Sequence, residues 1–529
     1  MRHIAPCFAP NSTHHSGTIG FAVSIDLQQP SSSVLRKQPP TDLTNLRTGF
    51  RHRLRQVYVR SDLVVLGLGV MIGGGIFNLA GRLAHNTAGP GVILSFMIAG
   101  IICLLAALCY AELASTMPSS GSAYSFTYVI FGELWAWIIG WALILELQLA
   151  AAVVARLWSM NMTRALEDFG VVIPPSLGRF VGQGEGFDLF TLFILLALTA
   201  IVAQGARLGV KALWVLVIGK LVAIGAVIVV GATRFDVDNL TPMPTPVQEA
   251  AAGVHTSVSP WSMIIGGETV FGWGGIFAAA GVIAFAYIGF DLIATASEEA
   301  EDAPRNVPQG MIRSLVLVIL IYIAVAVVMV GMSPHEKLNK DTPLVSAFDS
   351  LNLGFMTKVI DIGAMLGLTT VILVLLVSQT RVVFSMARDG LLPRGLAELS
   401  SHYRTPSMAT LAIGGTAIVI SQAVPVLPLE QLVVMGTLFA FLFVAAGVVV
   451  MRVRMPHLPR GFRVPLNPVL PILSALLTLW LMLNLDWKTW MIFGIWMVVG
   501  VAIYLVYGRR HSMLAPQSYS RRRGGRHAR

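Results

Sequence analysis

The chain has 529 residues, of which 55% are hydrophobic and only 12% carry a charge. Soluble domains carry about twice that charged share, and the apolar residues come in blocks close to the length that crosses about 30 Å of hydrocarbon, so a soluble protein is excluded. The net charge of +10, much of it in the tails, favours contact with a membrane surface over nucleic-acid binding. The three cysteines show neither a disulfide framework nor metal-ligand spacing. This composition predicts an all-α polytopic membrane protein.

Residues 1–45 are polar, rich in Ser, Pro and His, and lack helical periodicity, so we expect a disordered cytoplasmic tail without a signal peptide. Length and hydropathy then predict about twelve membrane-spanning helices. They are expected at residues 62–84, 90–112, 126–152, 188–206, 211–233, 275–299, 311–332, 358–384, 406–425, 431–452, 468–485 and 488–508. These spans belong to a transmembrane transporter domain over 46–510, and a basic cytoplasmic tail follows over 511–529.

Basic residues in the short connections predict the orientation of the chain. They follow the even-numbered spans, as at Arg207, Arg305 and Arg388. They also crowd just before the first span and after the last, as at Arg60 and Arg509. We therefore expect both termini in the cytoplasm and the protein in the cytoplasmic (plasma) membrane.

The first span contains the stretch GLGVMIGGGIF, residues 67–77, with five glycines in nine positions. Each glycine in a helix interior costs about 1 kcal/mol relative to alanine, so five forfeit roughly 4–5 kcal/mol. Unwound backbone is tolerated at membrane depth only where protein or a water-filled cavity satisfies its polar groups. The stretch therefore predicts a discontinuous helix at the bundle centre, with free N–H groups facing an anionic ligand group. Close helix packing at Gly69-x-x-x-Gly73 stays open as an alternative, whereas the spacing is one residue too long for a dinucleotide fingerprint.

A second glycine-interrupted segment, FAYIGFD, lies in the sixth span and carries Gly289 and the ionisable Asp291. A charged residue within a span is costly and indicates a functional site. Paired interrupted segments in corresponding positions of two repeats point to a transporter binding site. The internal repeat itself is weak in the sequence, with Ile-Gly recurring at residues 72–73 and 288–289.

Six motifs together resemble the amino acid–polyamine–organocation superfamily, and within it the cationic amino acid transporter family. They are GLGVMIGGGIF, GSAYSF, GWALILELQLAAAVVARLWS, FAYIGFDLIATASEEAEDAPRNVPQGMI, SQTRVVFSMARDGLLP and GFRVPLNPVLP. The similarity covers about residues 50–508. It implies the leucine-transporter fold, with a 5+5 inverted repeat, two additional helices and discontinuous first and sixth helices. Such a protein alternates between outward-open and inward-open states.

The resemblance also implies a substrate site, in which N–H groups at the first break hold the substrate carboxylate and sixth-helix carbonyls hold its ammonium. Donors then face an anion and acceptors face a cation. The residues carried over are Met71, Gly73, Gly74 and Gly75 for the carboxylate, and Phe285, Ala286 and Ile288 for the ammonium. Gly74 departs from the family pattern, which often has a hydroxyl residue there, so any such side-chain contact is lost. Asp291 is expected to orient or cap the break, or alternatively to contact a substrate cation.

Lys220 lies near the centre of the fifth span, where a lysine costs at least about 2.5–3.5 kcal/mol on insertion scales. It is too deep to snorkel easily, and its protonation can change as a cavity opens to either side. The resemblance implies proton coupling at this position, with Glu146 of the third span as its partner near the first helix. The alternatives are a permanently paired structural lysine and a glutamate satisfied by local hydrogen bonds.

The other charged and hydroxyl residues favour simpler roles. A solvated inner loop, with a cytoplasmic gate as the alternative, is expected for Glu298, Glu299, Glu301, Asp302 and Arg305. Arg381 and Arg388 are expected to anchor a helix at the membrane interface. Thr369 and Thr370 are expected to line the site or to bond their own backbone.

Taken together, these features predict a proton-coupled permease for cationic or small neutral amino acids that works by alternating access. The alternatives are an exchanger that swaps an amino acid for a related product, and a membrane amino acid sensor with little flux. Neither an enzyme motif nor a metal or cofactor site is expected. The expected partners are an amino acid, protons and the lipid bilayer, without nucleic acid, and the sequence carries no signal for an oligomeric state.

Overall fold

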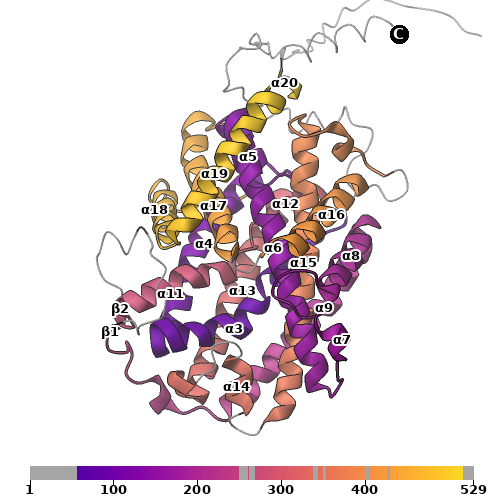
Figure 1. Ribbon diagram of the computed structural model, residues 1–529. Helices are drawn as coiled ribbons and strands as arrows, with labels where there is room; N and C mark the ends of the chain where they lie inside the picture. Colours follow the sequence, from indigo (N-terminus) through magenta and orange to yellow (C-terminus); the bar gives the residue numbers. More distant parts are fainter. Residues whose placement is uncertain are drawn as a thin grey trace, which may run out of the picture.

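The computed structural model is a bundle of helices (Figure 1). It describes residues 56–249, 260, 269–337, 343–349, 353–400, 405–425 and 429–515. The predicted tail over 1–45 and most of the predicted tail over 511–529 lie outside the described residues.

Long apolar helices dominate the described part of the chain, where eight helical segments can cross a membrane by length and composition. Their main helices are α4 (Val92–Thr116), α6 (Glu133–Asp168), α9 (Ala206–Ala232), α11 (Gly272–Tyr287), α13 (Ala303–Met332), α15 (Gly354–Arg388), α17 (Glu430–Arg454) and α19 (Trp487–Ile503). Three shorter apolar helices are α8 (Leu189–Ala203), α16 (Ser407–Ala423) and α18 (Val469–Leu483). Each of these helices overlaps one of the predicted spans.

Short elements connect the long helices. They are the helices α5 (Ala123–Ile130), α7 (Pro175–Gly178), α14 (Pro343–Asp349) and α20 (Arg509–His511), and the 3-10 or π turns η1 (Ala84–Ala88), η2 (Gly89–Gly91), η3 (Val237–Leu240), η4 (Ser297–Glu299), η5 (His335–Lys337), η6 (Arg394–Ala397) and η8 (Tyr504–Gly508). The strands β1 (Gln248–Glu249) and β2 (Thr269–Val270) pair antiparallel. The span predicted at 126–152 is wrong at its start, because the chain turns at Gly132, with φ of 106°, between α5 and α6.

Two helices are interrupted near the centre of the bundle. The first break separates α2 (Arg60–Met71) from α3 (Gly74–Leu83) at residues 72–73, and Ile72 there has ψ of 88°. The second separates α11 from α12 (Leu292–Thr295), where Gly289 has φ of 122°. A Cβ atom on Gly289 would lie 2.6 Å from Val70 Cγ1, so the second break packs directly against the end of α2. Both interruptions expected from the glycines are present.

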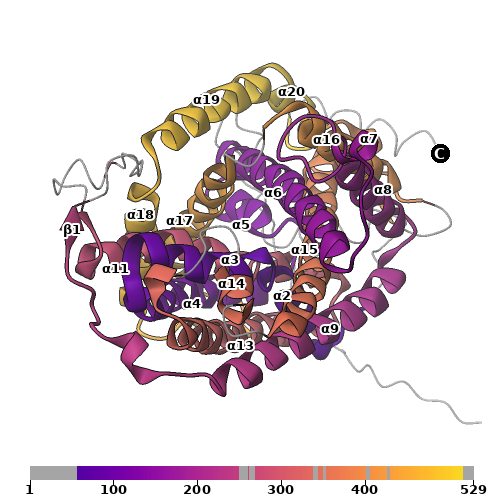
Figure 2. The same cartoon turned by 60° about the horizontal axis from the view of Figure 1, so that its bottom comes forward.

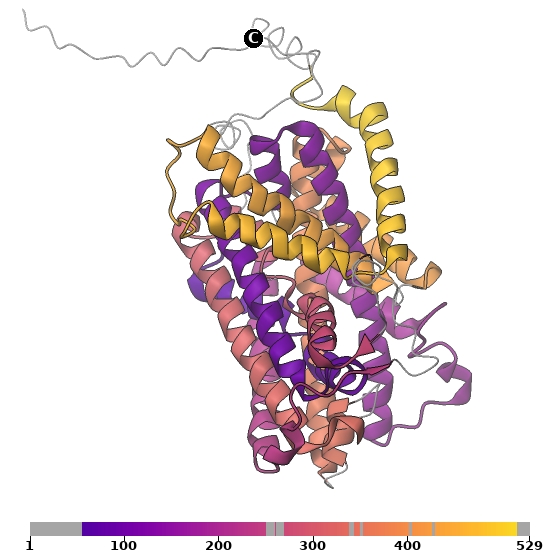
Figure 3. The ribbon, with the colours of Figure 1, turned by 90° about the vertical axis from the view of Figure 1, so that its left-hand side faces the viewer.

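The helix α9 shows how the bundle separates its interior from lipid. Its buried residues recur at alternating intervals of four and three, which places them on one face of a helix. The pattern comprises Leu213, Val217, Lys220, Ile224 and Val227, and Ala223 beside Ile224 is buried as well. The opposite face exposes valines, among them Val215 and Val222. Figure 2 shows α9 and α19 at the periphery and α2 and α3 further inside, and Figure 3 shows the C-terminal helices lying along the outside of the bundle.

The second break depends on the freedom of glycine to adopt positive φ. We expect Gly289→Ala to lower the free energy of unfolding by about 1–3 kcal/mol, because a side chain is strained at that φ and its Cβ would meet Val70. Gly494→Ala is the matched control, because Gly494 lies inside α19 with open space around it. It is expected to be neutral or to stabilise by up to about 1 kcal/mol. Thermal unfolding of the purified protein in detergent measures both, and equal melting temperatures would contradict the expectation.

Candidate functional site

The carbonyl groups at the end of α2 are held by Lys220 from α9. Its ammonium donates to Gly69 O at 2.8 Å, to Ile72 O at 2.7 Å and to Thr370 Oγ1 at 2.8 Å. The side chain is fully buried. An ammonium has three hydrogens, so these three contacts account for its whole donor capacity. The positive charge also lies at the C-terminal, electronegative end of α2. Lys220 therefore stabilises the conformation in which α2 ends at residue 71.

Two adjacent threonines of α15 make different contacts: Thr370 bonds to Lys220, and Thr369 bonds to the backbone of its own helix. Thr370 Oγ1 accepts from Lys220 and lies 2.7 Å from both Gly69 O and Gly367 O. Thr369 Oγ1 donates to Met365 O at 2.7 Å and accepts from Trp158 Nε1 at 2.9 Å. Thr370 is thus the third hydrogen-bond partner of Lys220, whereas Thr369 bonds to its own helix and to Trp158.

Tyr322 of α13 connects the two breaks, and the sequence analysis did not identify it. Its hydroxyl lies 2.5 Å from Met71 O and 3.3 Å from Ala286 O. Of these two carbonyls, only that of Ala286 was predicted to bind substrate, since Met71 was expected to act through an N–H group. Another predicted carbonyl, Phe285 O, accepts from the N–H of Ile288 at 3.2 Å. A hydroxyl among apolar residues of a helix gives little signal in the sequence, because only the neighbouring breaks give Tyr322 a polar partner.

The second half of the first interrupted helix begins without a side-chain cap. The helix α3 starts at Gly74. Gly73 precedes it with φ of −123° and ψ of −149°, and its N–H is bonded to Met71 O at 3.1 Å. The first N–H groups of a helix have no intrahelical acceptor. The start of α3, which includes the predicted Gly74 and Gly75, is therefore an electropositive helix end directed at the break.

The contacts of Glu146 lead to α17 and to Asp291 rather than to Lys220. The hydrogen bonds of Lys220 are complete without it, and the structure gives no ion pair between the two in the described chain. Glu146 of α6 packs against α17, where a Cβ on Gly436 would lie 2.9 Å from Glu146 Cβ. It shares a buried environment with Asp291 and Tyr110. Glu146 Oε2, Asp291 Oδ1 and the Tyr110 hydroxyl each lack a hydrogen-bond partner among the described residues.

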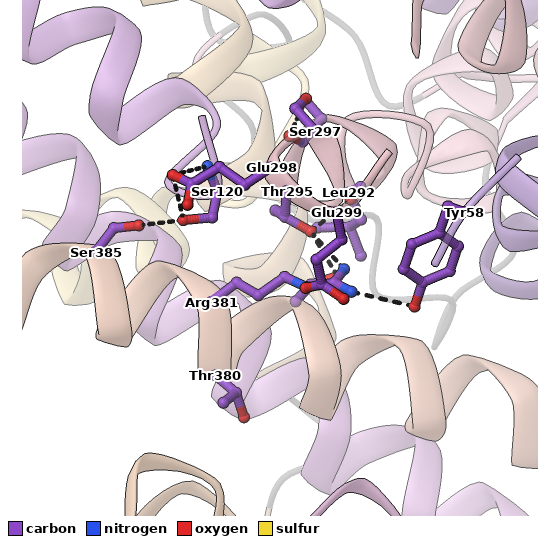
Figure 4. Close-up of polar contacts among 12 residues, drawn as sticks. Tyr58, Ser120, Leu292, Thr295, Ser297, Glu298, Glu299, Thr380, Arg381 and Ser385 are labelled. Carbon is purple, nitrogen blue, oxygen red and sulfur yellow. Dashed lines mark hydrogen bonds and ion pairs between the residues drawn. The ribbon is translucent and has the colours of Figure 1, made fainter. Parts of the chain in front are cut away.

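A charge cluster, defined as Glu298, Glu299, Arg381 and Arg388, joins the second interrupted helix to α15. Figure 4 shows Arg381 with Glu299 and Tyr58, and Glu298 with Ser120. The Arg381 guanidinium lies 2.8 Å from Glu299 Oε1, and both side chains are buried. Arg381 also donates to the Tyr58 hydroxyl at 3.1 Å and lies over the Tyr58 ring at 5.4 Å. The chain before α2, the end of the second interrupted helix and α15 are thereby held together.

The second pair of the charge cluster adds the loop before α5. Arg388 lies 3.2 Å from Glu298 Oε1, and that oxygen accepts from the N–H of Ser120 at 3.1 Å and from its hydroxyl at 3.0 Å. Next to Arg388, Asp389 accepts from the Tyr124 hydroxyl at 2.7 Å, and burial raises the pKa of Asp389 to about 6 despite the neighbouring Arg388.

The simpler expectations for this region are partly wrong. Glu298, Glu299, Arg381 and Arg388 form buried or half-buried pairs rather than a solvated loop and interface anchors. Glu301, Asp302 and Arg305 are exposed, as a solvated loop requires. The pairs form across about 80 to 90 residues of sequence, so charge spacing along the chain does not reveal them. The part of the chain that the structure describes holds no group of three or more residues able to bind a metal ion.

The comparisons with known proteins cover nearly the whole bundle. A family model described as amino acid permease matches residues 60–509. The methylthioribose transporter of Bacillus subtilis is 38% identical over 487 residues, covering 91% of this chain and 99% of the relative. The branched-chain amino acid permease BcaP of the same organism is 38% identical over 488 residues, with the same coverage. The vacuolar cationic amino acid transporter 4 of Arabidopsis thaliana is 27% identical, covering 91% of this chain and 96% of the relative.

Interrupted helices with buried charges beside the breaks are typical of membrane-embedded secondary transporters. The family match makes the class more specific: the chain belongs to the amino acid–polyamine–organocation superfamily of amino acid permeases, with a resemblance to cationic amino acid transporters. The expected family is therefore confirmed. Its relatives are transporters, so the prediction that the protein is not an enzyme is confirmed as well.

The buried pair of Arg381 and Glu299 makes a testable contribution to stability. We expect Arg381→Gln to lower the free energy of unfolding by about 3–5 kcal/mol, because Glu299 is left as a buried carboxylate without a cation. The double change Arg381→Met with Glu299→Met removes both charges and should recover most of the loss. Arg305→Gln serves as a control at an exposed position. Thermal unfolding in detergent measures all three, and a single variant as stable as the control would contradict the expectation.

Proposed function

We propose that the protein is a secondary active permease that couples amino acid uptake across the plasma membrane to protons by alternating access. The observation that carries this proposal is the buried Lys220 ammonium on the carbonyl end of the interrupted helix α2. In this proposal, α2 and α3 form one span together and the shorter helices α8, α16 and α18 also cross the membrane. They join the eight long segments to give twelve spans in the inverted-repeat arrangement, with both termini cytoplasmic.

The substrate is proposed to bind between the two breaks. The electropositive start of α3, at Gly74 and Gly75, would take the carboxylate, whereas the N–H of Gly73 donates to Met71 O in this structure. The carbonyls of Phe285, Ala286 and Ile288 would take the ammonium. Support comes from the direct contact of the two breaks at Gly289 and from Tyr322, which reaches a carbonyl on each side.

Protonation of Lys220 is proposed to be coupled to the shape of α2. The protonated side chain has three donors for Gly69 O, Ile72 O and Thr370. A neutral lysine has fewer hydrogens and leaves at least one carbonyl unpaired, which is costly in a buried site. Loss of the proton therefore favours a different conformation of α2, and a movement of α2 favours loss of the proton.

Glu146 and Asp291 are proposed to act together rather than with Lys220. Their unpartnered oxygens, with the Tyr110 hydroxyl, offer acceptors for a proton or for the cationic end of a substrate side chain. Relatives that carry the names of branched-chain and cationic amino acid transporters match this chain over about nine-tenths of its length. Small neutral and cationic amino acids are therefore both candidate substrates.

Uptake into proteoliposomes tests the proposal. With an imposed inward proton gradient, the protein should accumulate radiolabelled Ala, Leu, Arg or Lys without sodium. Lys220→Met should abolish gradient-driven accumulation, because the side chain can no longer carry the proton. Lys211→Met is the matched control on α9, because Lys211 is exposed and should be dispensable.

Other outcomes separate the alternatives. Accumulation that persists in Lys220→Met would contradict coupling through this lysine. Uptake that requires amino acid inside the vesicles, with no response to the gradient, would identify an exchanger. Binding of an amino acid without flux, both with a proton gradient and with amino acid inside the vesicles, would identify a sensor. Uptake of methylthioribose in place of all four amino acids would overturn the proposed substrate class.

A further inference from the structure

The chain after the last long helix returns to the body of the protein. We define the C-terminal segment as residues 504–515, which comprise η8, α20 and the following four residues. Ser512 is fully buried and Ala515 nearly so. The N–H groups of residues 512 to 515 all donate hydrogen bonds, to Gly508 O, Asp389 O, Ser512 Oγ and Ser512 O respectively. The segment is therefore an ordered part of the fold.

The first anchor of the segment is a buried carboxylate at the start of α6. Glu133 is fully buried and accepts from three hydroxyls, of Tyr128 at 3.1 Å, Tyr504 at 2.9 Å and Ser512 at 2.7 Å. Two of these three donors come from the C-terminal segment. A buried carboxylate that loses a donor is costly, so Glu133 stabilises the packed position of the segment.

The second anchor lies beside the charge cluster. The N–H of Met513 donates to Asp389 O at 3.0 Å. A Cβ on Gly390, which has φ of 81°, would lie 2.5 Å from His511 O, so the two backbones are in direct contact. Asp389 follows Arg388, which pairs with Glu298. A displacement of the segment would therefore remove contacts adjacent to the charge cluster.

The same segment carries a basic surface for which the described residues supply no ion pair, although His511 stacks on Tyr507 and bonds its carbonyl at 3.0 Å. Arg509, Arg510 and His511 are exposed, and residues 509–529 contain seven arginines, two histidines and no acidic residue. They follow directly on a helix whose end exposes Leu505 and Val506, as a lipid-facing surface does. Figure 1 shows α20 at the same end of the bundle as α5. Basic clusters directly after a membrane span are suited to anionic lipid headgroups.

We propose that Arg509, Arg510 and His511 bind anionic phospholipid headgroups, and that this binding holds the C-terminal segment against Glu133 and Asp389. The position of these residues beside an apolar helix end favours a membrane surface over a soluble polyanion. The proposal concerns the packing of the C-terminal segment, so it does not depend on the transported substrate or on proton coupling.

Hydrogen exchange of the full-length protein in nanodiscs tests it. The amides of residues 512–515 should exchange more slowly in phosphatidylcholine mixed with phosphatidylglycerol than in phosphatidylcholine alone, by about fivefold per bound arginine. The double variant R509Q/R510Q should lose this difference between lipids. The double variant R394Q/R454Q should keep it, because Arg394 and Arg454 are exposed arginines outside the segment. High salt should reduce the difference in the unchanged protein.

Several results would overturn the proposal. Equal exchange in the two lipids would do so, as would a lipid effect that survives in R509Q/R510Q. Protection by inorganic phosphate in phosphatidylcholine alone would assign the site to a free anion instead of a lipid. Ser512→Ala tests the anchor separately: it should speed exchange of residues 513–515 in both lipids, and unchanged exchange would contradict the role of Glu133.

Discussion

A helix that is interrupted inside a membrane protein leaves carbonyl groups without their amide donors, and hydrocarbon supplies no replacement. The rest of this molecule is arranged around that constraint. Lys220 from α9 and Tyr322 from α13 reach the carbonyls at the end of α2, and Thr370 from α15 completes the set. The neighbouring helices therefore contribute polar side chains where their positions face the break. Elsewhere, as on the outer face of α9, they present valine to the surroundings.

The buried charges of the charge cluster also need partners inside the protein, but here the partners are themselves charged. Desolvation of Arg381 and Glu299 is costly, and their pairing offsets that cost only while both partners remain close. The pair joins α15 to the end of the second interrupted helix, while Tyr58 adds the chain before α2. Such a contact gives little net stability, but it strongly disfavours partial separation. It therefore suits a connection that is either fully closed or fully open to water.

The sequence predicted the breaks and Lys220 because both violate the ordinary rules for a membrane helix. Five glycines weaken a helix, and a buried lysine is costly, so each feature is visible without knowledge of the fold. Partners were harder to predict. Adjacent positions on a helix differ in direction by about 100°. Glu146 points toward α17 because of how α6 is rotated about its axis, and no sequence motif specifies that rotation. The Arg381–Glu299 pair and the hydroxyl of Tyr322 likewise depend on packing between distant segments.

The bond from Lys220 to Ile72 O has a mechanical consequence. The carbonyl of Ile72 and the N–H of Gly73 belong to one planar amide, which rotates as a rigid unit. The lysine holds the carbonyl edge of this plane, and the N–H on the opposite edge donates to Met71 O. All three ammonium hydrogens are engaged by protein oxygen atoms, two of which belong to the backbone at the end of α2. A rotation of the amide between residues 72 and 73 would therefore break its bonds to Lys220 and to Met71 O together.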